Sequence, residues 1–133
     1  MIIESTPAVT NAPIDQVFSF LRDVSNLYHL LPLDKIKDWE ASTEHCSFKV
    51  QGGIIIPMEY QSEERPVQLI LKSGAKSPFP FTLTVNLQEE DNQTKGNLVF
   101  DAKVSKMIQL IAEKPLRNLF DTMAHKLTER FEQ

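Results

Sequence analysis

The feature that most constrains the fold is a change of hydrophobic period along the chain. Residues 34–104 alternate apolar and polar side chains with period two, which is typical of strands with one buried face. Short turns separate the alternating runs, so this region predicts about six consecutive strands in an antiparallel meander. Residues 2–10 alternate more loosely and predict a further strand at an edge, because Pro7 has no N–H to donate. The whole set is a seven-stranded antiparallel sheet.

Apolar residues recur at helical spacing in the segments before and after the meander. Two short helices are predicted between the first and second strands, the first beginning near Pro13 and the second ending before Pro32. Residues 115–132 predict a long amphipathic helix of about 27 Å at 1.5 Å per residue. Residues 107–111 form a separate short apolar stripe, which Lys114-Pro115 is predicted to interrupt.

This order of elements predicts an α+β fold in which a curved sheet closes over the long helix. Each strand and the long helix has one apolar face, and 41% of the 133 residues are apolar. A bent sheet cannot contact one helix along its whole width. The space between them is therefore either filled by large side chains or left as a cavity.

Three stretches resemble the helix-grip fold of the START-like superfamily, also called SRPBCC. They are residues 9–32 with their Pro-started helix and terminal proline, the CSFKVQGGI hairpin at 46–54, and residues 111–127 of the closing helix. The chain is most similar to small bacterial stand-alone members. The resemblance implies a single helix-grip domain over residues 1–133. Because its signature is a pattern rather than a chemical motif, it implies fold more than function.

Three functions are compatible with this resemblance. The first is binding of a small hydrophobic molecule, such as a lipid or a polyketide-like compound, between sheet and helix. The second is a cyclase or dehydratase acting on an aromatic or polyketide substrate, which needs a titratable group in the cavity. The third is a protein-interaction module resembling chaperone-ATPase activators, which predicts an apolar patch on the outer face of the sheet.

Apolar residues that face the predicted interior are the candidate ligand contacts, since such pockets are mostly apolar with few polar anchors. They are Phe48, Val50, Leu69, Leu71, Phe81, Leu83, Leu98, Phe100, Phe120 and Met123. Tyr28, His29 and Glu59 are the possible polar anchors. Leu30, Leu31 and the loop 73–80 are predicted at the entrance. This loop either contacts an anionic head group of the ligand or is an exposed connector whose Phe79 packs into the core.

Composition argues against several other classes of protein, namely nucleic-acid-binding, membrane-spanning, disulfide-rich and metal-binding proteins. A net charge of −4 gives no basic stripe for nucleic acid, and no apolar run is long enough to span a membrane. One cysteine, Cys46, and three widely spaced histidines predict no disulfide and no metal site. No catalytic residue and no cofactor are predicted. The N-terminus lacks the pattern of a signal peptide, so a cytoplasmic protein is expected. The sequence defines no oligomeric state.

Overall fold

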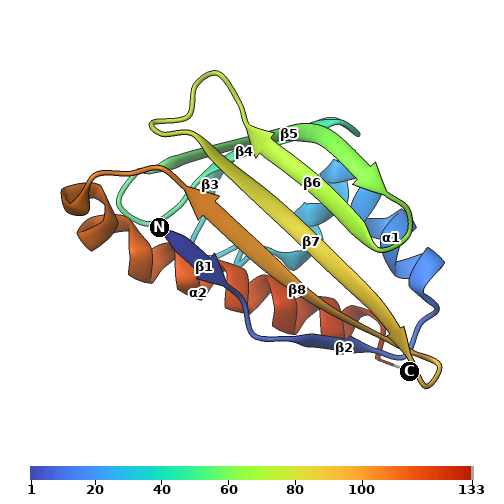
Figure 1. Ribbon diagram of the computed structural model, residues 1–133. Coiled ribbons are helices and arrows are strands. Elements are labelled where there is room, and N and C mark those ends of the chain that lie inside the picture. The colour runs from blue at the N-terminus through green and yellow to red at the C-terminus, as the bar shows by residue number, and fades with distance from the viewer. Residues whose placement is uncertain (133) are drawn as a thin grey trace.

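The computed structural model describes residues 1–132 and shows one antiparallel sheet packed against helices on its concave face (Figure 1). The strands follow the order β1-β8-β7-β6-β5-β4-β3, and β2 also pairs with β8. The bounds of the strands are β1 Ile2–Glu4, β2 Ala8–Thr10, β3 Lys37–Ala41, β4 His45–Lys49, β5 Ile55–Glu64, β6 Gln68–Ser73, β7 Phe81–Glu90 and β8 Gln93–Ala102. The predicted α+β class and helix-grip arrangement are confirmed.

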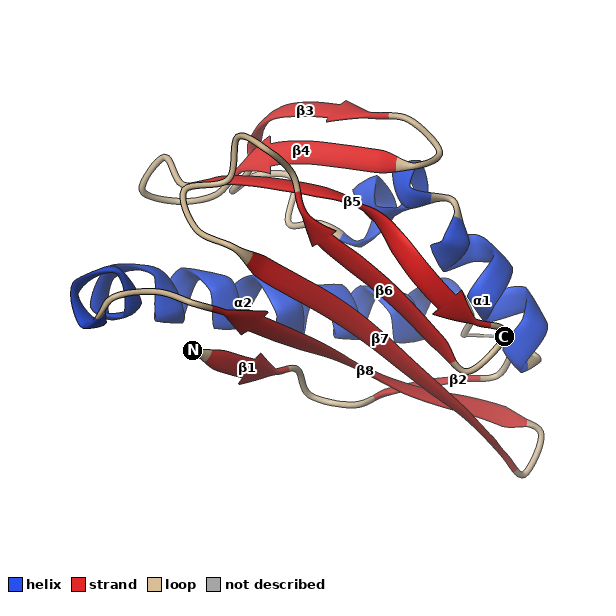
Figure 2. Ribbon diagram, turned by 45° about the horizontal axis from the view of Figure 1, so that its top comes forward, coloured by secondary structure: helices blue, strands red, loops and turns tan. Residues whose placement is uncertain are grey.

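The predicted first strand is split into two. Ser5 breaks the regular pairing: its backbone N–H donates to the carbonyl of Leu98, and its hydroxyl accepts from the N–H of the same residue. Pro7 follows and has no N–H to contribute. As a result β1 and β2 lie along β8 one after the other, as Figure 2 shows, and they form one interrupted edge of the sheet.

The hairpin between β7 and β8 is tighter than the polar stretch 89–95 suggests. Both strands continue in register to the pair Glu90 and Gln93. Only Asp91 and Asn92 form the turn, with φ of 51° and 66°. Asp and Asn tolerate this left-handed conformation, which two-residue hairpins of this handedness require at both positions. The turn therefore keeps the strands paired for almost their whole length.

The short helices are α1, Ile14–Arg22, and the 3₁₀ helix η1, Val24–Leu30. The buried face of α1 is apolar and consists of Ile14, Val17, Phe18 and Leu21. Asp23 ends α1 and caps η1, because its carboxylate accepts from the N–H of Ser25. Both helices lie near the C-terminal end of the long helix, on the concave side of the sheet (Figure 1).

The long helix α2 runs from Lys106 to Arg130 without interruption. The predicted break at Lys114-Pro115 is therefore wrong. Pro115 has no N–H to donate to the carbonyl of Ile111, four residues earlier. Ile111 is exposed, so water can satisfy that carbonyl and the helix continues. Ser105 caps the first turn by accepting from the N–H of Ile108. The extra turns carry α2 beyond the end of the sheet.

Candidate functional site

The interior between sheet and helix is packed with side chains. All ten predicted contact residues are buried in one core. The ring of Phe100 lies 4.8 Å from that of Phe81 and 4.9 Å from that of Phe120, measured between centroids. These are the separations of aromatic rings in direct contact. The ten residues therefore form the packed core of the domain, and their contact with a ligand stays a prediction.

An apolar groove lies at the end of this core, beside the first turns of α2. Its volume is about 330 Å³. Residues of the β4–β5 turn, the loop before β7 and α2 line it: Gly53, Ile54, Ile55, Pro78, Phe79, Ile108, Ile111 and Ala112. None of these side chains is titratable. The arrangement can take up apolar surface but supplies no general acid or base.

Phe79 lines the groove and also packs into the core. Its ring makes edge-on contacts with Phe81, at 6.2 Å, and with Phe100, at 6.5 Å. The structure places the two parts of the predicted entrance in different positions. The loop 73–80 lines the groove through Pro78 and Phe79, but Leu30 and Leu31 do not line it and are buried in the core.

The three predicted polar anchors lie elsewhere. Met58 is buried, so the next residue of β5, Glu59, points to the outer face of the sheet. There it pairs with Lys72, whose Nζ lies 3.5 Å from Oε1 of Glu59. Tyr28 packs against Trp39 with ring centroids 5.4 Å apart. His29 lines a different groove. None of the three belongs to the apolar groove, so the polar group that an enzyme would need there is not supplied by these residues.

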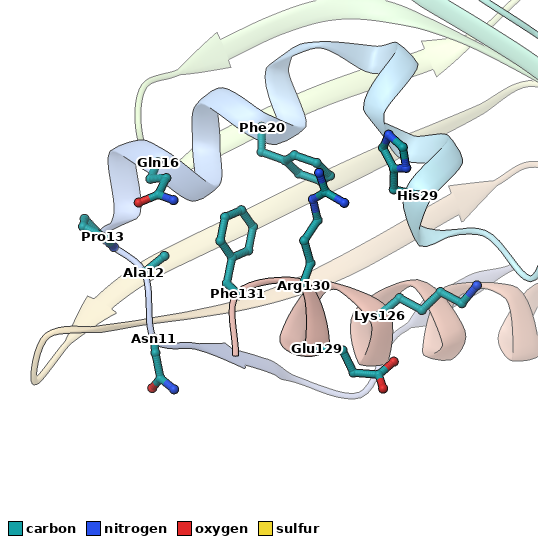
Figure 3. Close-up of a pocket in the computed structure, with 10 residues that line it drawn as sticks. All are labelled: Asn11, Ala12, Pro13, Gln16, Phe20, His29, Lys126, Glu129, Arg130 and Phe131. Atoms are coloured by element: carbon teal, nitrogen blue, oxygen red, sulfur yellow. The ribbon is translucent and has the colours of Figure 1, made fainter. Parts of the chain in front are cut away.

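A second, polar groove separates α1 and η1 from the C-terminal end of α2 (Figure 3). Its volume is about 940 Å³, and it opens widely to solvent. Lys126 donates to the carbonyl of Leu31 at 2.6 Å, and the guanidinium of Arg130 lies 4.4 Å from the ring centre of Phe20. Phe20 and Phe131 meet edge to face at 5.6 Å. Lys126 and Arg130 of α2 therefore serve to connect α2 to η1 and α1.

The outer face of the sheet carries a row of polar side chains across four adjacent strands, β6, β7, β8 and β1. Side-chain amides form a hydrogen-bonded row from Gln68 through Asn86 and Asn97 to Glu4. The protein-interaction hypothesis expects an apolar patch on this face. Ile2 on β1 is exposed, but three large exposed apolar residues lie close together on α2, namely Met107, Leu110 and Ile111.

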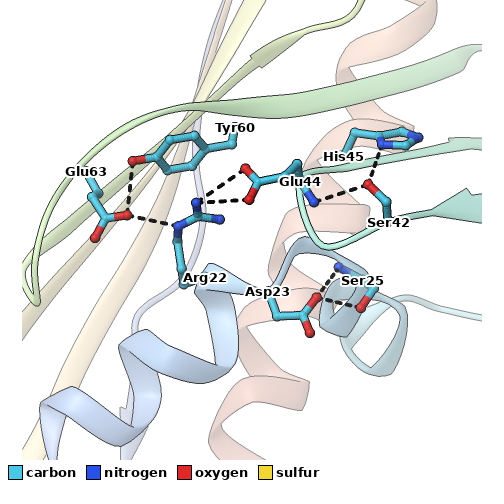
Figure 4. Close-up of polar contacts among 8 residues, drawn as sticks. All are labelled: Arg22, Asp23, Ser25, Ser42, Glu44, His45, Tyr60 and Glu63. Atoms are coloured by element: carbon cyan, nitrogen blue, oxygen red, sulfur yellow. Dashed lines mark hydrogen bonds and ion pairs between the residues drawn. The ribbon is translucent and has the colours of Figure 1, made fainter.

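A charged cluster joins α1 to the far end of β5 (Figure 4). The Nε of Arg22 donates to Glu63 at 2.9 Å, and its Nη2 lies 3.3 Å from both carboxylate oxygens of Glu44. The guanidinium stacks on Tyr60, whose hydroxyl also donates to Glu63 at 3.0 Å. The carboxylate of Glu63 is therefore held from two sides, by Arg22 and by Tyr60.

This cluster predicts a pH dependence of stability. Desolvation, followed by the hydrogen bond to Glu63, raises the pKa of Tyr60. The folded state thus holds this proton more tightly than the unfolded state. The contribution of Tyr60 is complete below about pH 10 and is lost as pH rises through the folded-state pKa. We expect the free energy of unfolding above about pH 10 to fall more steeply in the native protein than in Tyr60→Phe.

Urea denaturation at a series of pH values measures this difference, with Tyr28→Phe as the matched control. Parallel pH profiles for the native protein and Tyr60→Phe would contradict the assignment.

No protein-family model and no curated protein sequence matches this chain. Solved structures do. A START superfamily protein from Mycobacterium smegmatis superposes with a TM-score of 0.68 at 13% identity, covering 98% of this chain and 96% of that one. The protein TTHA0849 from Thermus thermophilus gives a TM-score of 0.74 at 13% identity, covering 98% and 97%. The XoxI protein from Bacillus cereus gives 0.73 at 14% identity, covering 98% and 94%.

The chain has the START-like helix-grip fold. Identities this low establish the fold alone. Within residues 1–132, no group of three or more His, Cys, Asp or Glu side chains is placed to hold a metal ion. The same residues contain no helix that is long and apolar enough to cross a membrane.

Cys46 lies in the core on β4. Burial raises the pKa of its thiol to about 12. We expect no reaction with Ellman's reagent at about pH 8 in the folded protein and one equivalent of reaction in denaturant, since the thiolate is the reactive form. Rapid stoichiometric reaction of the folded protein would show that Cys46 is accessible.

Proposed function

We propose that this START-like domain binds a small hydrophobic molecule in the apolar groove beside the start of α2. The observation that carries the proposal is the groove itself, whose lining is apolar and whose volume is about 330 Å³. Sites for small molecules in proteins are concave, mostly apolar and roughly 300 Å³ or larger. The groove meets these conditions, whereas the space between the sheet and α2 is occupied by aromatic rings in contact with one another.

Removal of apolar surface from water drives this binding, at about 25 cal/mol per Å². The ligand contacts Ile54 and Ile55 at the start of β5, Phe79 in the loop before β7, and Ile108 and Ile111 on α2. Proteins with the same fold use the space between sheet and helix for ligands, as the START resemblance implies. Here the packed core favours a site at the mouth of that space.

A neutral fluorescent probe tests the proposal. N-phenyl-1-naphthylamine has about 17 non-hydrogen atoms, and ligands of moderate size gain about 0.3 kcal/mol per atom. The sum of about 5 kcal/mol corresponds to a Kd on the order of 0.1 mM. We expect saturable enhancement of probe fluorescence when folded protein is titrated in, with a stoichiometry of about one.

Near-UV circular dichroism of the same samples confirms that the protein stays folded, because partly unfolded states also bind such probes. A linear, unsaturated response over the whole accessible concentration range would overturn the proposal.

A further inference from the structure

The N-terminal turns of α2 present apolar side chains to solvent. Met107, Leu110 and Ile111 are 73%, 86% and 63% exposed, although residues of this size are normally covered in a folded domain. Figures 1 and 2 both show these turns extending beyond the ends of β1 and β8. We call residues 106–114 the α2 tip. Only Ile111 of the three also lines the apolar groove, so the tip presents apolar surface beyond the groove.

The charge around the tip is opposite to that of the chain as a whole. Lys103, Lys106 and Lys114 give residues 103–114 a net charge of +2, while the complete chain carries −4. Lys76 adds a further exposed positive charge in the loop before β7, whose residues Pro78 and Phe79 line the groove. In the part of the chain that the structure describes, none of these lysines has a carboxylate partner. An apolar surface bordered by free lysines is typical of segments that lie in a membrane interface.

We propose that the α2 tip docks on the surface of a bilayer containing anionic lipids. Met107 and Leu110 insert between the headgroups, and the lysines remain at the level of the phosphates. Long lysine stems allow this position, because they follow apolar surface while the ammonium stays hydrated. Each lysine close to an anionic surface strengthens binding about fivefold.

Like charges argue against a second copy of the chain as the occupant. Two tips meeting face to face would bring Lys103, Lys106 and Lys114 of one copy near the same residues of the other. Such pairs repel one another, whereas anionic lipid headgroups supply the opposite charge.

Docking at a membrane extends the proposed function and rests on it, because the groove opens beside the tip. A hydrophobic molecule dissolved in the bilayer would then reach Ile108 and Ile111 without crossing water. The two functions use different side chains, since Met107 and Leu110 do not line the groove. They can therefore be tested separately.

Vesicle sedimentation tests the docking, with vesicles of phosphatidylcholine alone or mixed with phosphatidylglycerol. We expect the native protein to sediment with the mixed vesicles and to stay in solution with the neutral ones. Leu110→Glu lowers the partition coefficient at least tenfold, because the new carboxylate must enter an anionic interface. Lys106→Ala lowers it about fivefold. Asn118→Glu, an equal charge change on an exposed part of the same helix outside the tip, leaves it within twofold of the native value.

Failure of the native protein to bind mixed vesicles, or unchanged binding by Leu110→Glu, would overturn the docking. So would a concentration-dependent dimer that Leu110→Glu dissociates in sedimentation velocity without any vesicle binding. Binding of N-phenyl-1-naphthylamine by Leu110→Glu separates the two proposals. Native-like probe binding with lost sedimentation supports docking by the tip, whereas sedimentation without probe binding in the native protein supports docking and contradicts the groove.

Discussion

Replacement of Phe100 by alanine is expected to destabilise the protein by about 3–5 kcal/mol, the range observed for truncation of buried aromatic residues. The ring of Phe100 has no exposed surface and contacts the rings of Phe81 and Phe120. Its removal loses the free energy of burying the ring and leaves a cavity that the neighbouring rings cannot fill. A domain of this size has about 5–15 kcal/mol of stability in total. The variant is therefore expected to be close to unfolding.

Urea denaturation followed by circular dichroism measures this loss. Leu33→Ala is the matched control, because Leu33 is 46% exposed and its truncation is expected to cost less than about 0.5 kcal/mol. If Phe100→Ala does not fold, Phe100→Leu keeps the test open with an expected loss of about 1.5 kcal/mol. A loss below about 1 kcal/mol for Phe100→Ala would show that the space around the ring is not closely packed.

The second large effect is expected at the groove. Ile111→Glu places a carboxylate in the wall that the ligand contacts, and a ligand that covers it must remove water from a charge. We expect the affinity for N-phenyl-1-naphthylamine to fall at least tenfold, equivalent to about 1.4 kcal/mol or more. Stability is expected to change little, because Ile111 is 63% exposed in the free protein.

Asn118→Glu again serves as the control, since it adds the same charge on α2 outside the apolar groove. It is expected to bind the probe with native affinity. Native affinity in Ile111→Glu would place the probe somewhere other than this groove.

Most of the fold follows from local patterns in the sequence. The alternation at Phe81, Leu83 and Val85 identifies the buried face of β7, because successive side chains of a strand point to opposite faces. The same logic fails for Glu59, since residues 54–60 are nearly all apolar and do not show which face is buried. The helix propensity of the sequence also predicts a break at Pro115, because proline is disfavoured within a helix. The helix continues through Pro115 because the turn before it is exposed to water.

The candidate site is harder to predict, because it depends on contacts between distant parts of the chain. Phe100 and Phe120 face each other across the interior, and whether their rings fill it depends on the curvature of the sheet. Arg22 and Glu63 are 41 residues apart, so no local signal joins them. The sequence does contain one indication of the groove. The apolar residues at 107–111 cover more of the helix surface than a single buried face needs.

The central claim is that a hydrophobic ligand occupies the groove beside the start of α2. Heteronuclear NMR of the isotope-labelled protein, titrated with N-phenyl-1-naphthylamine, tests it most directly. We expect the largest chemical-shift changes at Ile54, Phe79, Ile108 and Ile111, and we expect these changes to saturate together. Changes confined to the polar groove, at Phe20, His29 and Arg130, or no saturable changes at all, would contradict it.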